Sequence, residues 1–153
     1  MGYSGGWRED GGNVRPGGAA ALPRLDRALP WRPITPARFN AFCRGLPATT
    51  HVVQWGGADV WKVGGKVFAI GWGDGRKLAA TFKVSEIAFE VLKEQPGLRP
   101  APYLASRGLS WIQNYDKPGL GDAELKDYLK QSYALVVQGL TRKKRRELGL
   151  EAV

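Results

Sequence analysis

Two glycine-rich turns that carry cations are the features of this sequence whose residue types and spacing could do chemistry. Residues 64–66 read Gly-Gly-Lys, and residues 73–77 read Gly-Asp-Gly-Arg-Lys. The stretch 60–84, which contains both turns, holds five basic residues and one acidic residue. A narrow glycine turn flanked by cations can approach a nucleic acid closely and contact its phosphates, and binding then releases counterions. The sequence therefore predicts a surface that binds a polyanion, with DNA as the candidate partner.

The candidate contacts are basic side chains on these turns, on the strands beside them and on two neighbouring loops, all projecting from one side of the fold. The nucleic-acid-binding residues that we predict are Lys62, Lys66, Arg76, Lys77, Lys83, Arg107 and Lys117. No predicted helix carries the clustered Arg, Asn or Gln of a recognition helix, so we expect phosphate contacts with weak sequence specificity. The basic run 142–146 is expected to be a solvated helix end that could add phosphate affinity.

An ordinary solvated surface is an equal alternative for these cations. Lysine on an edge strand prevents strands from pairing edge to edge, and hairpin geometry alone requires the glycines.

The stretch 60–84 also predicts the strands that position the cations. The Gly-Gly pair at 64–65 favours a two-residue hairpin, in which Trp61 would face Phe68. The core side of this sheet would then hold Trp61, Val63, Phe68 and Ile70. The second turn, 73–77, is longer and leads into a third strand at 78–83. Trp72, beside that turn, is the aromatic residue that we expect to be exposed.

The rest of the chain from residue 35 alternates helix and strand signals. Thr35 followed by Pro36 is an N-cap and first-turn pair, and Ser85, Asp122 and Thr141 are further N-cap candidates. The predicted helices are 36 to about 45, 86–95, 123–140 and 142–146, and the other extended segments are 51–55, 98–103 and 110–115. This order predicts an α+β fold, a two-layer sandwich in which helices pack on one face of an antiparallel meander sheet. The opposite sheet face would be open to solvent or to a partner.

Composition divides the chain into three parts. Residues 1–34 hold seven of the 21 glycines and four of the 10 prolines, so we expect a flexible tail. Residues 35–148 form the predicted α+β domain, and residues 149–153 form a short C-terminal tail. The formal net charge of +9 agrees with a polyanionic partner. A single cysteine fits a reducing compartment, and no apolar run approaches the roughly 20 residues that span a bilayer, so we expect a cytoplasmic protein without membrane contact.

Enzyme and cofactor motifs are missing from the sequence. It has no P-loop, no His-Glu-x-x-His motif, no paired cysteines and no Gly-x-Ser-x-Gly motif. His51 is the only histidine and Cys43 the only cysteine, so an ordinary strand residue and a small buried hydrophobe are their expected roles. We therefore predict a non-catalytic protein with no cofactor, no metal and no small-molecule substrate.

Several segments taken together resemble the MmcQ/YjbR family. They are Thr35-Pro36 with Phe39 and Phe42, residues 60–69, residues 99–104, Trp111, and the helix pairs Glu124-Leu125, Ser132-Tyr133 and Val136-Val137. The resemblance covers roughly residues 35–148. It implies a frataxin-like (CyaY-like) fold and a bacterial DNA-binding protein with a double-wing motif. Residues 105–111 depart from the family pattern, which has more polar and aromatic side chains there.

Two further functions follow from the resemblance and from the open sheet face. A frataxin-like fold suggests iron delivery as a function. We reject this function because the predicted first helix carries Arg38 and Arg44 and no carboxylate. A protein-interaction module of unknown partner, using the open sheet face or the tail, is the alternative to DNA binding.

Overall fold

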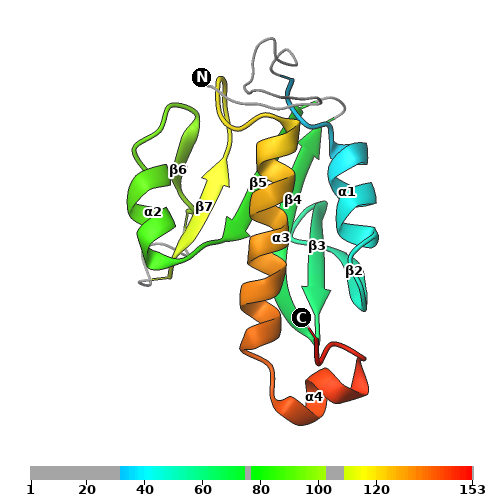
Figure 1. Cartoon of the computed structure of the whole chain (residues 1–153). Helices are drawn as coiled ribbons and strands as arrows, with labels where there is room; N and C mark the ends of the chain where they lie inside the picture. The colour runs from blue at the N-terminus through cyan, green and yellow to red at the C-terminus, as the bar shows by residue number, and fades with distance from the viewer. Residues whose placement is uncertain (1–31, 75–76, 103–108, 153) are drawn as a thin grey trace, which may run out of the picture. The chain divides into compact units, whose positions relative to one another are not determined.

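The computed structural model describes residues 32–74, 77–102 and 109–152 (Figure 1). The chain divides into two units, one of residues 1–33 with 121–123 and one of residues 34–120 with 124–153. All six strands, and every predicted site residue that the structure describes, belong to the second unit. No helix in the described part of the chain is long and apolar enough to cross a membrane.

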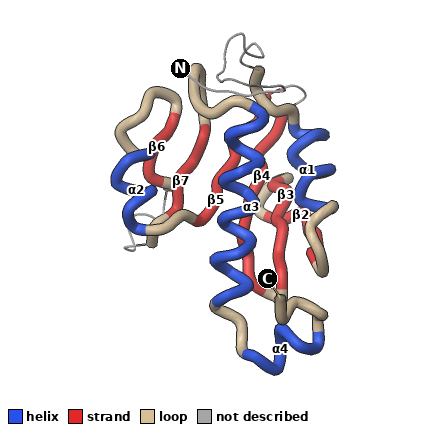
Figure 2. The backbone as a smooth tube through the Cα atoms, in the orientation of Figure 1, coloured by secondary structure: helices blue, strands red, loops and turns tan. Residues whose placement is uncertain are grey.

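Six antiparallel strands form one sheet in the order β2-β3-β4-β5-β7-β6. The strands are β2 (Thr49–Gln54), β3 (Ala58–Val63), β4 (Lys66–Asp74), β5 (Lys77–Lys83), β6 (Leu98–Pro100) and β7 (Trp111–Asn114). From β2 to β5 each strand pairs with the next one in the chain, which makes a meander. β7 then pairs with β5, and the short β6 forms the far edge (Figure 2).

The helices begin near the predicted N-caps. They are α1 (Pro36–Arg44), α2 (Glu86–Leu92), α3 (Asp122–Gln138) and α4 (Arg142–Glu147). The side chains of Thr35, Ser85 and Thr141 each accept a hydrogen bond from the backbone N–H three residues later, which satisfies a donor of the first helical turn. In Figure 1, α1 and α3 lie on the same face of the sheet.

One main core lies between the helices and the sheet. Phe39 of α1, Phe82 of β5, and Leu129 and Val137 of α3 are fully buried in it. Leu150 also belongs to this core, so the packing continues past residue 148. The predicted α+β sandwich, with helices on one face of an antiparallel sheet, is confirmed.

The β3–β4 hairpin turns at Gly64 and Gly65, whose φ angles of +60° and +82° suit a two-residue turn. After the first two residue pairs the register shifts at a β-bulge, so Trp61 faces Ala69. The predicted Trp61–Phe68 pair is therefore wrong. The reason lies in packing, because the bulge lets the successive residues Phe68 and Ala69 both enter the main core.

The same bulge moves Ile70 to the other face of the sheet. Ile70 packs with Ala58 and Val60 in a second cluster, whose partly buried neighbours Val52 and Val67 also come from strands. The predicted core side is confirmed for the other three residues, Trp61, Val63 and Phe68, and is wrong for Ile70.

The second hairpin is tighter than predicted. β4 extends to Asp74 and β5 begins at Lys77, and these two residues face each other. Sheet pairing continues through Gly73 and Leu78, so the 73–77 loop that the sequence predicts is mostly strand.

Helix α2 is also shorter than predicted, since it ends at Leu92. Ala88 and Leu92 pack toward the main core, as their helical spacing indicates. Ile87 and Val91, which share that spacing on the next stripe, are 81% and 57% exposed. Phe89 also packs against the main core, so Ile87 and Val91 are the apolar residues of this helix that are left exposed.

Candidate nucleic-acid interface

The tip of the β3–β4 hairpin lies against the turn that joins α3 to α4. A Cβ added to Gly64 would lie 2.7 Å from Leu140 Cδ1, so the glycine packs directly on that side chain. Lys66 begins β4 two residues after Gly64, and α4 begins at Arg142, two residues after Leu140. Figure 1 shows α4 beneath this end of β3 and β4. One hairpin tip and one basic helix thus meet at a single end of the sheet.

Five successive residues of this helix are basic, namely Arg142, Lys143, Lys144, Arg145 and Arg146. We call these five residues together with Lys66 the basic end. Two carboxylates lie near it, with Lys144 Nζ 3.7 Å from Glu147 and Arg146 Nε 3.8 Å from Glu151, and all four side chains are exposed. Exposed ion pairs at such distances are weak. No described carboxylate pairs with Lys66, Arg142 or Lys143, so the basic end keeps most of its positive charge.

The sheet face away from the described helices, which we call the open face, carries a chain of polar contacts. One row of directly facing residues crosses all six strands, namely Val52, Val60, Ile70, Thr81, Gln113 and Arg99. Arg99 Nε donates to Gln113 Oε1 at 2.8 Å, and Gln113 Nε2 donates to Thr81 Oγ1 at 3.4 Å. The Arg99 guanidinium also lies 4.1 Å from the centre of the Tyr115 ring, at cation–π distance. These contacts hold one cation in a fixed position on the sheet.

Three of the predicted binding residues, Lys62, Lys77 and Lys83, lie on the open face, and Lys66 lies in the basic end. Lys62 and Lys83 are each adjacent in their strands to core residues, so strand alternation directs them to the open face. Lys66 faces Val63, which is a core residue, and therefore belongs to the helix side of the sheet at its margin.

Two of the described candidates, Lys77 and Lys117, lie at the far end of the sheet. Successive hairpins of a meander point in opposite directions, and β4 separates Lys66 from Asp74 by eight residue steps, or roughly 26 Å. Lys77, which faces Asp74, and Lys117, which follows β7, are therefore remote from Lys66. Arg76 and Arg107 lie outside the described residues. The expectation that both glycine turns project from one side of the fold is wrong, because strand β4 runs between them.

The cations of α4 and β6 are not among the contacts predicted from the sequence. The run Arg142–Arg146 is visible as a charge pattern, but its place beside the hairpin depends on the contact between Gly64 and Leu140. No local pattern encodes a contact between residues so far apart. Arg99 lies in a three-residue edge strand whose only sequence signal is the extended conformation that proline imposes on the residue before it.

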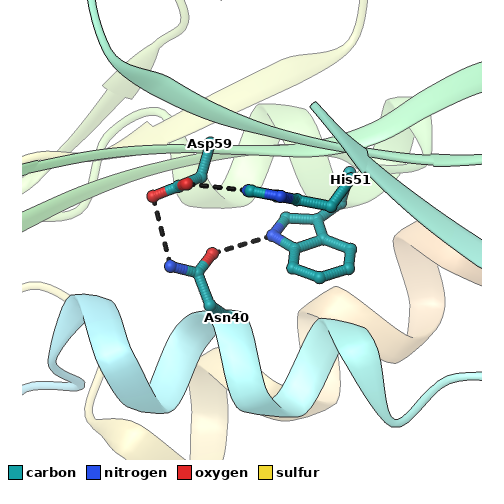
Figure 3. Close-up of polar contacts among 4 residues, drawn as sticks. Asn40, His51 and Asp59 are labelled. Atoms are coloured by element: carbon teal, nitrogen blue, oxygen red, sulfur yellow. Dashed lines mark hydrogen bonds and ion pairs between the residues drawn. The ribbon is translucent and has the colours of Figure 1, made fainter. Parts of the chain in front are cut away.

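A hydrogen-bonded network joins α1 to the other edge of the sheet (Figure 3). Asn40 Nδ2 donates to Asp59 Oδ2 at 3.2 Å, and the indole Nε1 of the buried Trp61 donates to Asn40 Oδ1 at 2.8 Å. His51 Nε2 lies 2.8 Å from Asp59 Oδ1, and the His51 ring lies 4.6 Å from the Trp61 ring. The described partners of the His51–Asp59 pair are Asn40 and Trp61, so the network fixes α1 on strands β2 and β3.

Replacing Asn40 by alanine should lower the free energy of unfolding by about 1–3 kcal/mol, because it leaves a buried indole N–H without its acceptor. Urea denaturation followed by circular dichroism measures this change. Gln138→Ala, at an exposed position of α3, is the control and should change stability by less than about 0.5 kcal/mol. Equal stability of Asn40→Ala and the unmodified protein would contradict the structural role of the network.

The Cys43 thiol is expected to be unreactive because its side chain is buried. It is fully buried in the main core, and this burial raises the pKa of its thiol. Because the thiolate is the reactive species, native protein at about pH 8 should resist a disulfide reagent such as dithionitrobenzoate and should react once unfolded in urea. Rapid release of thionitrobenzoate from native protein would show instead that this thiol is accessible.

Comparisons with known proteins agree with this architecture. Protein DR2400 of Deinococcus radiodurans, whose crystal structure is described with the domain DUF419, matches with a TM-score of 0.64 and 24% identity, over 76% of this chain and 88% of that protein. A protein from Pseudomonas syringae matches with a TM-score of 0.54 and 19% identity, over 67% of this chain and 98% of its own. Identities this low show a common fold. A search of curated proteins gave no match.

The family comparison goes further than the fold. The model of the YjbR family matches residues 44–135, which span α3 almost to its end and all six strands. This match covers more than half of the chain, and it agrees with the resemblance found in the sequence. The protein belongs to the YjbR family.

Proposed function

We propose that the chain is a non-catalytic DNA-binding protein that contacts the phosphate backbone through the basic end. The observation that carries the proposal is the packing of Gly64 on Leu140, which puts Lys66 of the β3–β4 hairpin beside the five cations of α4. Four of these six cations, Lys66, Arg142, Lys143 and Arg145, have no described carboxylate partner, and the other two make long, exposed ion pairs. Such a surface attracts a phosphate backbone mainly through counterion release.

The expected binding mode is a single wing supported by a short helix. α4 has six residues, too few to lie along a major groove as a recognition helix does. Backbone contacts position a protein on DNA and carry little sequence information, so we expect weak sequence specificity. Lys77 and Lys117 lie too far from Lys66 to join this contact, and Lys62 and Lys83 lie on the other face of the sheet.

A titration of fluorescein-labelled random duplex at two salt concentrations tests the proposal. If three or four phosphates are neutralised, the affinity should fall about 40- to 150-fold between about 50 and 200 mM salt, because log K falls by about 0.9 per contact for each decade of salt. Fluorescence anisotropy reports both affinities. Absence of any binding at the lower salt concentration, with a folded protein, would end the DNA-binding proposal.

A protein-interaction module is the second candidate, and the exposed apolar pair on α2 favours it. Ile87 and Val91 lie one helical turn apart and are both largely exposed, and Glu86, Glu90 and Glu94 flank them. A partner that covers this surface would co-purify with the chain at constant stoichiometry, and the double change Ile87→Ser with Val91→Ser would release it. Loss of such a partner would not change the affinity for duplex DNA, because the basic end sets that affinity. The two functions can therefore be tested separately.

A further inference from the structure

Two tryptophans are exposed at the end of the sheet that is opposite the basic end. Trp55 lies in the turn between β2 and β3, is 59% exposed and has a φ of +52°. A bulky residue in this left-handed region is uncommon and strained, and glycine would be the ordinary choice there. Trp72 on β4 is 38% exposed. Neither residue contributes to the main core.

Sheet register brings these two residues close together. Gln54 faces Ala58 across the β2–β3 hairpin, and Trp55 follows Gln54. Asp59 faces Gly71 across the next strand pair, which puts Trp72 beside Ala58. Two strand spacings therefore separate the backbones of the tryptophans, roughly 10 Å. The turn that follows Trp55 consists of small residues, Gly56, Gly57 and Ala58.

The cations on the same sheet face as Trp72 indicate the charge of a ligand, and Lys77 is the one nearest to Trp72 in the sheet register. Strand alternation places Lys62, Lys77, Lys83 and Arg99 on the open face. No strand residue on this face whose side chain is described carries a carboxylate. Arg99 is held by Gln113 and by the Tyr115 ring, so its side chain loses little conformational freedom when a ligand binds. The open face is thus complementary to an anion that also offers flat rings.

We propose that the open face binds single-stranded nucleic acid, with Trp55 and Trp72 stacking on bases and the four cations contacting phosphates. Single strands expose their bases for stacking on aromatic side chains, and every base has such a face, so binding tolerates different sequences. A duplex hides these rings inside its own stack and would gain little from the two tryptophans. The proposal rests on nucleic-acid binding as the function and names a second class of ligand, on a surface separate from the basic end.

The test uses the whole chain and a fluorescein-labelled oligothymidylate of about 16 nucleotides, the upper range of such sites. The double change Trp55→Ala with Trp72→Ala should weaken oligothymidylate binding at least about thirtyfold and leave duplex binding within about threefold, since each stacked base contributes strongly. Ile87→Ala with Val91→Ala, which also removes two large exposed side chains, is the matched control and should change neither affinity. Trp72→Phe keeps a flat ring and should stay within about fivefold of the unmodified protein, which separates lost stacking from misfolding.

The possible outcomes separate this inference from the proposed function. Oligothymidylate affinity that is unchanged by loss of both tryptophans overturns the open-face proposal. If Lys66→Glu with Lys143→Glu removes binding of both ligands and the tryptophan changes remove neither, DNA binding stands and the open-face proposal falls. If the unmodified protein binds duplex and not oligothymidylate, the open-face proposal alone falls, and if it binds neither, both proposals fall.

Discussion

Replacing Lys66 and Lys143 together by glutamate is expected to weaken duplex binding about thirtyfold at low salt. The two residues lie on different elements, the β3–β4 hairpin and α4, and no described carboxylate pairs with either of them. An ion contact near the surface contributes about 1 kcal/mol at 4 Å in water, and reversal adds repulsion to the loss of attraction. Two such changes approach 2 kcal/mol or more, and 1.4 kcal/mol corresponds to a factor of ten. The slope of log affinity against log salt should also fall by about two.

A matched control separates a local contact from general charge. Lys77→Glu with Lys117→Glu changes the net charge by the same amount at the opposite end of the sheet. This control should weaken duplex binding less than about threefold, through the long-range field alone. Equal losses in the two double variants would mean that DNA responds to net charge and that the basic end is not a site.

Gly97→Ala is expected to destabilise the protein by about 3 kcal/mol or more. Gly97 has a φ of +86°, and a Cβ there would lie 2.3 Å from the Asp116 carbonyl oxygen and 2.4 Å from the Gly119 backbone nitrogen. Both contacts are with backbone, so no side chain can move aside. The Gly97 carbonyl also accepts from the N–H groups of Tyr115 and Asp116, which ties this turn to the 116–119 loop. Overpacking and left-handed strain therefore act at one position.

Gly65→Ala isolates the part of that effect due to backbone conformation. Gly65 has a similar φ of +82°, and no atom lies within 4 Å of a Cβ built on it. The conformational strain alone should lower stability by about 1–2 kcal/mol. Urea denaturation of both variants measures the difference, which is attributable to the crowding of Gly97 against the loop. Similar losses in the two variants would contradict that close approach.

Local signals in the sequence predicted the elements of the fold well. Thr35, Ser85 and Thr141 cap helices where their side-chain oxygens and the following residues indicate. The Gly64-Gly65 pair turns the hairpin as two-residue turn chemistry requires, and Trp72 is exposed as expected. Each of these features depends on a few neighbouring residues, which is why the sequence alone was sufficient.

Features that depend on distant contacts were not predictable in the same way. The bulge that pairs Trp61 with Ala69 exists because Phe68 and Ala69 both find room in the core, and that room is made by helices elsewhere in the chain. The prediction that Ile70 faces the helices failed for the same reason. The prediction that both glycine turns project from one side of the fold failed because it summed charges along 60–84 without the length of β4, which carries its two turns to opposite ends.

The candidate site was therefore only partly predictable. Lys66 was found from its glycine turn, whereas its neighbours on α4 come from the other end of the chain and meet it only through Leu140. Trp55 was missed because a left-handed tryptophan leaves no pattern in the sequence.

Lysine footprinting tests the central claim most directly. Acetylation of exposed lysines with and without saturating duplex, read by mass spectrometry, reports which side chains the DNA covers. The basic end predicts strong protection of Lys66, Lys143 and Lys144, with Lys77 and Lys117 modified equally in both samples. Protection of Lys77 and Lys117 with continued modification of Lys66 and Lys143 would contradict the proposal and place the DNA at the other end of the sheet.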